Sequence, residues 1–338
     1  MSARVAVLSL ASSRDLSREE AAAVMRGVMA GEVTPAQVGS ILTALSIKGA
    51  RSQELAGFAD AMREFAVPFP HGLSVPFIDT CGTGGDGSGT FNISTAAAFV
   101  VAAAGLPVVK HGNRSVTSRC GSADVLTALG ARLEIPPGPM AGVLRETGIA
   151  FLSAPLYHPA MRKVQGIRQE LGFRTVFNLL GPLNNPAGIA IQLLGVYSPG
   201  LIRTMAEVLE LLGAGRAMVV HGGGLDEITP TGPTRVAELG EGGIREYAIS
   251  PGDFGISLSD IGDLRGGDAA ENARILREVL GGETGAARDA VVLNAGAAIY
   301  LGGGARSLAG GIDRAEEVIE AGSALARLDA FVAATRGA

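Results

Sequence analysis

From residue 76 onward, short apolar runs alternate with stretches of helical length and periodicity. The apolar runs that we assign to strands cover residues 76–79, 107–109, 191–197, 217–220 and 234–239. The stretches that we assign to helices cover residues 94–104, 139–147, 201–212, 268–279, 286–301 and 315–335. Parallel strands need a long crossover connection, usually a helix, so this alternation predicts a mainly parallel sheet covered by helices. We therefore predict an α/β domain over residues 75–338.

The first 70 residues carry only helical signals. Ser17-Arg18-Glu19-Glu20 and Thr34-Pro35-Ala36-Gln37 have the pattern of capping boxes, the second with proline at the first helical position. A third helix is predicted from Ser52 to about Phe65, before turn and breaker residues at 67–72. Residues 1–70 are thus predicted to form a small all-helical domain, which needs a partner surface to bury its apolar stripes.

Composition and charge exclude several classes of protein. The chain has 338 residues, of which 47% are hydrophobic and 18% charged, and this composition fits a globular enzyme. Its net charge of -5 disfavours non-specific binding of nucleic acid. The most apolar stretch, residues 94–109, is interrupted by Gly105 and Pro107 and is shorter than the roughly 20 residues of a membrane-spanning helix. No signal peptide is recognisable, so we expect a cytoplasmic protein without membrane or nucleic-acid partners.

A glycine-rich segment follows the first predicted strand. Gly82-Thr83-Gly84-Gly85-Asp86-Gly87 leads through Asn92-Ile93-Ser94-Thr95 into a predicted helix. Glycines let backbone N–H groups approach a phosphate closely, and a helix N-terminus favours an anion. Alone, however, the glycine run could be a plain structural turn, and the second segment a plain helix cap.

A second polar segment, residues 110–118, follows the next predicted strand. Its nine residues hold three potentially basic side chains, a carboxamide and three hydroxyls. In open α/β sheets, ligands bind beyond the carboxyl ends of the strands, and both segments begin at such ends. Lys110 and Arg114 could be ordinary surface charges, but two anion-binding loops in one domain predict a polyphosphorylated substrate.

Two adjacent carboxylates, Asp226 and Glu227, follow the predicted strand at residues 217–220. Adjacent acids on a solvated loop are common and need have no function. Beside a phosphate site, however, such a pair can hold Mg²⁺, which takes few protein carboxylates and keeps waters and substrate phosphates as its other ligands.

In combination, these motifs resemble the anthranilate phosphoribosyltransferase family. The resemblance runs from about residue 16 to residue 336 and includes Asn178-Leu179-Leu180-Gly181-Pro182-Leu183, His158-Pro159-Ala160-Met161, Arg168, Arg174-Thr175 and Asn294-Ala295-Gly296. It implies the nucleoside phosphorylase/phosphoribosyltransferase-type fold and a homodimer built through the helical domains. It also implies Mg²⁺-dependent transfer of the phosphoribosyl group of 5-phosphoribosyl 1-diphosphate (PRPP) to the amine of anthranilate, in tryptophan biosynthesis. Residues 1–14 depart from the pattern and do not look like the family's first helix.

The resemblance also implies a role for individual residues. Lys110, Asp226 and Glu227 would be catalytic, and Ser94, Asp226 and Glu227 would hold magnesium. The residues expected around anthranilate are Gly82, His111, Asn113, His158 and Arg168. The residues expected around PRPP are Gly82, Gly85, Asp86, Thr90, Asn92, Ile93, Ser94, Thr95, Lys110, His111, Gly112, Asn113, Arg114, Ser115, Val116, Thr117, Ser118 and Ser122.

Some of these assignments have simpler alternatives in the sequence alone. Arg162, Lys163 and Arg174 compete with Arg168 for the anthranilate carboxylate, and only the family pattern favours Arg168. His111, His158 and His221 could be structural histidines. Asn184-Asn185-Pro186 is most simply a turn.

Two other functions remain open at this level. A pyrimidine nucleoside phosphorylase shares the fold, but an Asp-Glu pair would have little purpose there without a diphosphate and its metal. A non-catalytic nucleic-acid-binding relative is disfavoured by the acidic balance of the chain.

Overall fold

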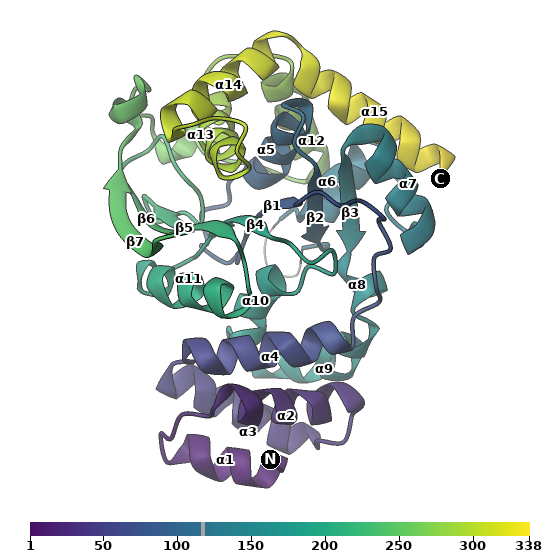
Figure 1. Cartoon of the computed structure of the whole chain (residues 1–338), viewed down its shortest axis with the longest axis vertical. Helices are drawn as coiled ribbons and strands as arrows, with labels where there is room; N and C mark the ends of the chain where they lie inside the picture. The colour runs from purple at the N-terminus through teal and green to yellow at the C-terminus, as the bar shows by residue number, and fades with distance from the viewer. Residues whose placement is uncertain (116–118) are drawn as a thin grey trace.

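The computed structural model describes residues 1–115 and 119–338. Its N-terminal part consists of four helices, α1 (Ala3–Ala11), α2 (Arg18–Ala30), α3 (Pro35–Lys48) and α4 (Ser52–Glu64). Both capping boxes are confirmed. The hydroxyls of Ser17 and Thr34 accept hydrogen bonds from the backbone N–H groups of Glu20 and Gln37, and the side chains of Glu20 and Gln37 accept hydrogen bonds from the backbone N–H groups of Ser17 and Thr34. Figure 1 shows these helices as one purple layer at the N-terminal end of the molecule.

Helix α1 corrects the expectation that residues 1–14 would not form a first helix. Its N-cap is Ser2, whose hydroxyl accepts a hydrogen bond from Val5 N–H, and the helix buries Ala6 and Leu10. Only two of its residues are buried, four positions apart, so the apolar periodicity is too short to be recognised in the sequence.

The central sheet has seven strands in the order β3-β2-β1-β4-β5-β6-β7. The strands are β1 (Ile78–Gly82), β2 (Val108–Gly112), β3 (Ile149–Ser153), β4 (Ile191–Gly195), β5 (Arg216–Gly222), β6 (Thr234–Gly240) and β7 (Gly243–Ile249). The first five pair in parallel, and β6 and β7 add an antiparallel edge, so the predicted fold class is confirmed. The order reverses between β1 and β4, and such a reversal is where α/β sheets bind ligands.

Strands β3 and β7 are absent from the sequence prediction. Only Gly148 separates β3 from the preceding helix α7 (Pro137–Thr147), so the sequence gives no turn segment to mark the change. Strand β7 is an edge strand with mostly exposed or half-buried residues. The predicted final helix, residues 315–335, is in fact two helices, α14 (Leu308–Glu320) and α15 (Ser323–Gly337), separated where Gly322 has a φ of 67°.

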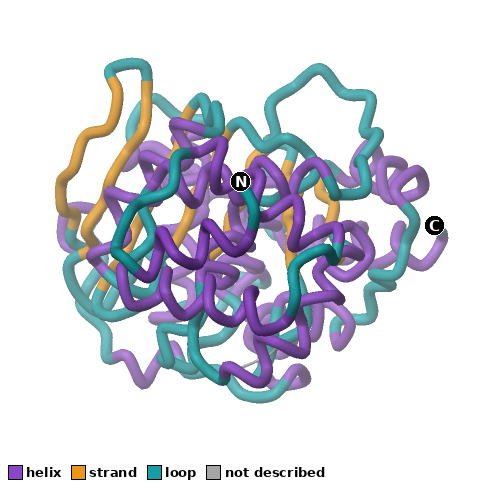
Figure 2. Tube along the Cα trace, turned by 90° about the horizontal axis from the view of Figure 1, so that it is seen from below, coloured by secondary structure: helices purple, strands orange, loops and turns teal. Residues whose placement is uncertain are grey.

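Helices cover both faces of the sheet. One hydrophobic cluster joins the sheet to α5 (Ile93–Ala103), α6 (Ser122–Ala128), α7, α12 (Ala269–Leu280), α13 (Ala286–Leu301), α14 and α15. A second cluster joins the other face to α11 (Ile202–Leu211), α10 (Val176–Leu180) and the four N-terminal helices. Viewed from the N-terminal end, helices lie in front of the middle of the sheet, while its β6–β7 edge stands clear of them on the left (Figure 2). No helix of the described residues is long and apolar enough to cross a membrane.

A segment of the later chain returns to the N-terminal helices. Helix α9 (Arg162–Leu171) follows the short α8 (Ala154–Tyr157) and packs against α3 and α2, among the N-terminal helices at the bottom of Figure 1. Lys163 donates to the carbonyls of Met29 and Ala30, both at 2.8 Å, and so caps the C-terminal end of α2. Val164 of α9 shares the hydrophobic cluster of the N-terminal helices. This segment is therefore packed as part of the helical layer.

Candidate active site

The glycine segment starts inside the sheet. Strand β1 runs on to Gly82, so Asp79 is the second residue of the strand and fully buried, and it does not close the strand as expected. Gly82 pairs with Gly195 of the neighbouring β4. Gly84 and Gly85 follow with φ of 67° and 80°, the left-handed region that favours glycine. The loop therefore leaves the carboxyl end of β1 at the point where the strand order reverses.

Asp226 lies directly against this loop. Its Oδ2 accepts a hydrogen bond from Gly84 N–H at 2.7 Å, and its own N–H donates to Asp86 Oδ2 at 3.4 Å. A Cβ on Gly82 would lie 2.5 Å from Asp226 Oδ2, and one on Gly195 would lie 1.6 Å from the Asp226 carbonyl oxygen. Two glycines thus make the room that brings this carboxylate to the ends of β1 and β4.

Glu227, Ser94 and Lys110 complete the same cluster. The backbone of Ser94 and the ammonium of Lys110 each act to lower the pKa of Glu227, against the effect of its burial. Lys110 Nζ donates to Ser94 Oγ at 3.3 Å and to the Thr80 carbonyl. Lys110 is only 4% exposed and lies within β2, so the expectation of a loop lysine is wrong. The structure therefore brings together the three predicted metal ligands and the predicted catalytic lysine.

The charges of this cluster are unbalanced. Burial, and then the neighbouring Asp86, raise the pKa of Asp226, and burial, and then Asp226, raise the pKa of Glu227. Lys110 is the cation that acts on Glu227 in the opposite direction. A bound divalent cation would remove the mutual repulsion, because it favours the ionised form of each carboxyl.

The donor set fits magnesium. Two carboxylates and a hydroxyl are hard oxygen ligands, and they leave room for the waters and phosphate oxygens that Mg²⁺ retains. In residues 1–115 and 119–338, no three His, Cys, Asp or Glu side chains gather into a closed metal site.

The N-terminal end of α5 faces the same cluster through its backbone. The side chains of Ile93 and Thr95 are buried, each 1% exposed, so these predicted site residues can offer a ligand only their N–H groups. Asn92 is not a side-chain cap. Its amide donates to the Cys120 carbonyl at 3.3 Å and accepts from Asn272 at 2.9 Å. Thr90 lies in an isolated bridge to Arg265, next to the glycine loop.

Beyond β2 the chain turns into α6. A Cβ on Gly112 would lie 2.3 Å from Ser122 Oγ, so glycine lets this predicted site serine approach the strand end. The Ser115 backbone N–H donates to Asp124 Oδ2 at 2.8 Å, and Arg114 pairs with Asp124 Oδ1 at 3.3 Å. Asn113 is exposed, and its Oδ1 accepts from Arg114 N–H. The remaining predicted residues, Val116, Thr117 and Ser118, lie outside the described residues.

His111 and His158 contact each other. Their rings meet edge to face with centroids 5.0 Å apart, and His158 Nε2 lies 2.8 Å from the Asn184 carbonyl oxygen. Burial, and then His158, lower the pKa of His111 to about 3, and burial lowers that of His158. Both rings are therefore neutral at pH 7. His111 Nε2 is buried with no hydrogen-bond partner among the described residues, whereas His221 is held by the Val196 carbonyl at 2.7 Å.

Asn184 and Asn185 form more than the turn expected from the sequence. Both are buried, and Asn185 Nδ2 donates to Asp79 Oδ2 at 3.0 Å and to the Val109 carbonyl at 2.7 Å. Asn185 thereby ties the segment after α10 to both β1 and β2. Burial raises the pKa of Asp79 to about 6. Sequence reasoning did not connect Asp79 with Asn185, because the two residues are 106 positions apart in the chain.

The structure also separates the competing cations around α9. Arg162 donates to Pro159, Lys163 caps α2, and Arg174 donates to the Gly85 carbonyl and lies over the Tyr197 ring. Arg168 instead lies with its guanidinium 5.3 Å from the centre of the Phe177 ring, and burial lowers its pKa. In the described part of the chain it has no carboxylate partner, so its charge is available to a ligand.

Comparison with known proteins places the chain in a family. Residues 74–325 match a model described as "Glycosyl transferase family, a/b domain", and residues 6–66 match one described as "Glycosyl transferase family, helical bundle domain". Anthranilate phosphoribosyltransferase of Rubrobacter xylanophilus is 55% identical over 98% of this chain and 97% of its own length. The resemblance stated from the motifs is thereby confirmed.

Solved structures agree. Anthranilate phosphoribosyltransferase from Thermus thermophilus superposes with a TM-score of 0.92 at 48% identity, covering 98% of this chain and 99% of that one. Anthranilate phosphoribosyltransferase from Saccharomyces cerevisiae in complex with PRPP and Mg superposes with a TM-score of 0.90 at 30% identity, covering 99% of this chain and 98% of that one. These relatives favour phosphoribosyl transfer over nucleoside phosphorolysis, and the chain belongs to the anthranilate phosphoribosyltransferase family.

Proposed function

We propose that this chain transfers the phosphoribosyl group of PRPP to the amine of anthranilate, giving N-(5-phosphoribosyl)anthranilate and diphosphate. The observation that carries the proposal is the position of Asp226. It joins the glycine loop after β1 to a cluster of Glu227, Ser94 and Lys110 at the reversal of the strand order. The PRPP and Mg complex of the yeast relative supports the same ligands here.

In this proposal, diphosphate departs from C1 of the ribose while negative charge grows on its oxygens. Asp226, Glu227 and Ser94 would hold the magnesium ion, which neutralises part of that charge when bound. The Lys110 ammonium and the N–H groups of the glycine loop donate to the diphosphate oxygens from fixed positions, which stabilises the transition state without reorganisation. Lys110 is already held in place by Thr80 and Ser94.

The acceptor needs orientation more than proton removal. The aromatic amine of anthranilate is neutral at pH 7, so no strong general base is required, and good orientation can supply roughly 7 kcal/mol of the barrier. The neutral His111 and His158 offer ring surfaces without adding positive charge beside Lys110. Arg168 would bind the carboxylate of anthranilate, because a guanidinium matches it in a planar, two-pronged arrangement.

Loss of anthranilate fluorescence tests the proposal. We expect a decrease that requires both PRPP and Mg²⁺ and that stops when the metal is chelated. Asp226→Asn retains an oxygen acceptor for Gly84 N–H but removes a charge, so it should weaken activation by Mg²⁺ by about 10- to 100-fold. Glu241→Gln, on the turn between β6 and β7, is the matched control. No fluorescence change with folded wild-type protein contradicts the proposed function.

A homodimer through the helical domains is a further part of the proposal. Val5 and Leu8 of α1 are 49% and 60% exposed, and Ile47 of α3 is 83% exposed. Exposed apolar side chains on two helices that contact each other favour burial against a second copy. Light scattering of the wild-type protein should give twice the mass of one chain. The double variant Leu8→Glu, Ile47→Glu should give the mass of a single chain. Leu258→Glu, at a residue 73% exposed elsewhere, should leave the dimer intact.

A further inference from the structure

Arg168 is held without being neutralised. It lies in the last turn of α9, and among the described residues its recorded partner is an aromatic ring, with the guanidinium carbon 5.3 Å from the centre of Phe177. A carboxylate in that place would fix the guanidinium but would also compete with an incoming anion. An aromatic face attracts the cation yet leaves all five N–H donors free.

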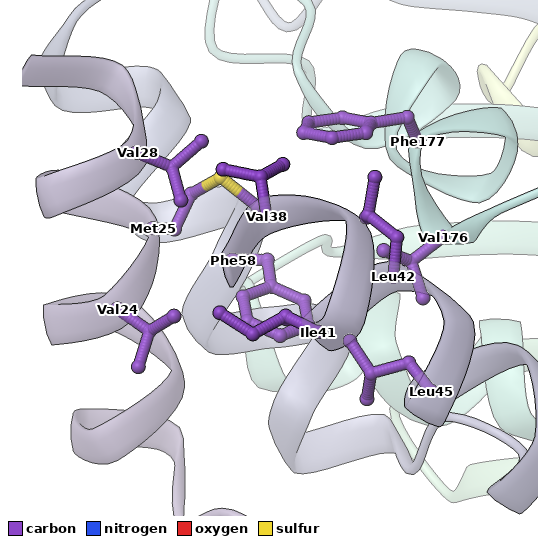
Figure 3. Close-up of a pocket in the computed structure, with 10 residues that line it drawn as sticks. All are labelled: Val24, Met25, Val28, Val38, Ile41, Leu42, Leu45, Phe58, Val176 and Phe177. Atoms are coloured by element: carbon purple, nitrogen blue, oxygen red, sulfur yellow. The ribbon is translucent and has the colours of Figure 1, made fainter. Parts of the chain in front are cut away.

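The ring of Phe177 is itself fixed by the helical domain. Phe177 is 5% exposed and lines a cavity of about 10 Å³ together with residues of α2, α3 and α4 (Figure 3). Its neighbours there include Val28 of α2 and Val38 and Leu42 of α3. The side chains that line this cavity are all apolar, so the ring of Phe177 is held by direct packing contacts with them.

The backbone on either side of Phe177 is also fixed. Thr175 N–H donates to Asn178 Oδ1 at 3.0 Å, which starts the short helix α10. After α10, the Leu183 carbonyl accepts from Arg63 of α4 at 2.7 Å, and the Asn184 carbonyl lies 2.8 Å from His158 Nε2. Phe177 therefore stands between the helical domain and the segment that contacts His158.

From these contacts we propose that Phe177 is a positioning residue for the acceptor substrate. Its ring holds the Arg168 guanidinium in the orientation that binds the carboxylate of an aromatic acid, and it transmits the packing of α2 and α3 to that guanidinium. The proposal rests on the proposed function, because the carboxylate is that of anthranilate. It assigns to Phe177 no contact with PRPP or with the metal.

Two changes separate the electrostatic role from packing. Replacing Phe177 by 3,4,5-trifluorophenylalanine keeps the shape of the ring but weakens its negative face, and Phe177→Leu removes the ring. Val176→Ala is the matched control, because Val176 is 4% exposed, lines the same cavity and has no recorded contact with Arg168. It should lower the melting temperature without changing recognition of the acceptor.

Steady-state kinetics give the first readout. The trifluoro ring should raise the KM for anthranilate by about threefold and Phe177→Leu by about tenfold, the range of a partly desolvated cation–π contact. The KM for PRPP should stay within about twofold of wild type in both. In an Arg168→Ala background, neither change at position 177 should raise the KM for anthranilate further. An equal rise in that background, or an equal rise in Val176→Ala, overturns the proposal.

A second readout does not depend on turnover. The Nε–Hε resonance of Arg168 in the ¹⁵N-labelled full-length protein, assigned with Arg168→Lys, reports the ring current and the order of the guanidinium. Phe177→Leu should shift this resonance and lower its order parameter, whereas Val176→Ala should not. If wild-type protein consumes no anthranilate but the resonance responds as expected, the proposed function fails and the contact stands. An unchanged resonance in Phe177→Leu overturns the positioning role itself.

Discussion

The Cα of Gly82 lies so close to Asp226 that a Cβ at this position would stand 2.5 Å from Asp226 Oδ2. The same carboxylate oxygen accepts from Gly84 N–H at 2.7 Å. Because Gly82 has no side chain, the carboxylate of Asp226, in the loop after β5, can lie beside the glycine loop. The contact joins segments 142 residues apart.

Gly82→Ala should therefore impair catalysis more than stability. The added methyl group displaces Asp226, and a misplacement of about 1 Å in an active site costs about 100-fold in kcat/KM. Activity assays with varied Mg²⁺, together with thermal unfolding, measure the two effects. Gly142→Ala in α7 is the control, since a Cβ there meets only the end of Arg145 at 3.9 Å. Wild-type kinetics for Gly82→Ala would show that Asp226 has no fixed role.

Arg168→Ala should raise the KM for anthranilate and leave that for PRPP nearly unchanged. Loss of a charged hydrogen-bonding partner for a carboxylate costs about 1.5–3 kcal/mol, or about 10- to 100-fold. Arg162→Ala should be close to wild type, because Arg162 is exposed and, within residues 1–115 and 119–338, donates only to the Pro159 carbonyl. Equal increases in both KM values would refute the assignment of Arg168 to the acceptor.

Glu54→Ala should destabilise the helical domain. Glu54 is fully buried and accepts from Leu16 N–H at 2.9 Å, from Arg51 N–H at 2.8 Å and from the Lys48 ammonium at 2.9 Å. Its removal leaves a buried ammonium with one fewer partner and should lower the free energy of unfolding by about 3 kcal/mol. Urea unfolding measures this change.

The control for Glu54 is Glu64→Ala. Glu64 pairs with Arg26 on the surface, where both side chains are about half exposed, so the midpoint of unfolding should barely move. If both variants unfold at the same urea concentration, Glu54 does not organise the helical domain as its contacts indicate.

Acidification should destabilise the protein through His111. The pKa of His111 is lowered in the folded protein to about 3, from an ordinary value near 6.5. At pH values between these two, His111 is therefore protonated in the unfolded chain and neutral in the folded protein. Between these two pH values stability falls as pH falls, by up to about 1.4 kcal/mol per pH unit. Unfolding of wild type and His111→Asn at several pH values measures the difference.

The comparison of wild type with His111→Asn is needed because Asp79 changes the stability with pH in the opposite direction. Burial raises its pKa to about 6, so its folded form gains relative stability on acidification over part of the same range. This contribution is common to both proteins. The slope against pH should be shallower for His111→Asn than for wild type, and identical slopes would show that His111 does not stay neutral in the fold.

The parts of the fold that the sequence predicted depend on neighbours along the chain. The capping boxes at Ser17 and Thr34 and most strands and helices of the α/β domain follow from local pattern, and they were found, except that the helix predicted over residues 315–335 is two helices. Helix α1 and strands β3 and β7 were not predicted. Helix α1 buries Ala6 and Leu10 alone among its residues, β7 is a mostly exposed edge strand, and only Gly148 separates the apolar run of β3 from α7. Lys110 was assigned to a loop, because a charged residue is rarely buried in a strand without a partner.

The site divides in the same way. The sequence by itself determined which chemical groups are present: glycines that admit an anion, a lysine, two adjacent carboxylates and an arginine. Tertiary structure alone decided that Asp226 seats against Gly84, that Asn185 ties Asp79 to β2, and that Arg168, among four nearby cations, rests on Phe177. Each of these contacts joins separate segments, and it exists only because sheet pairing and helix packing bring their backbones together.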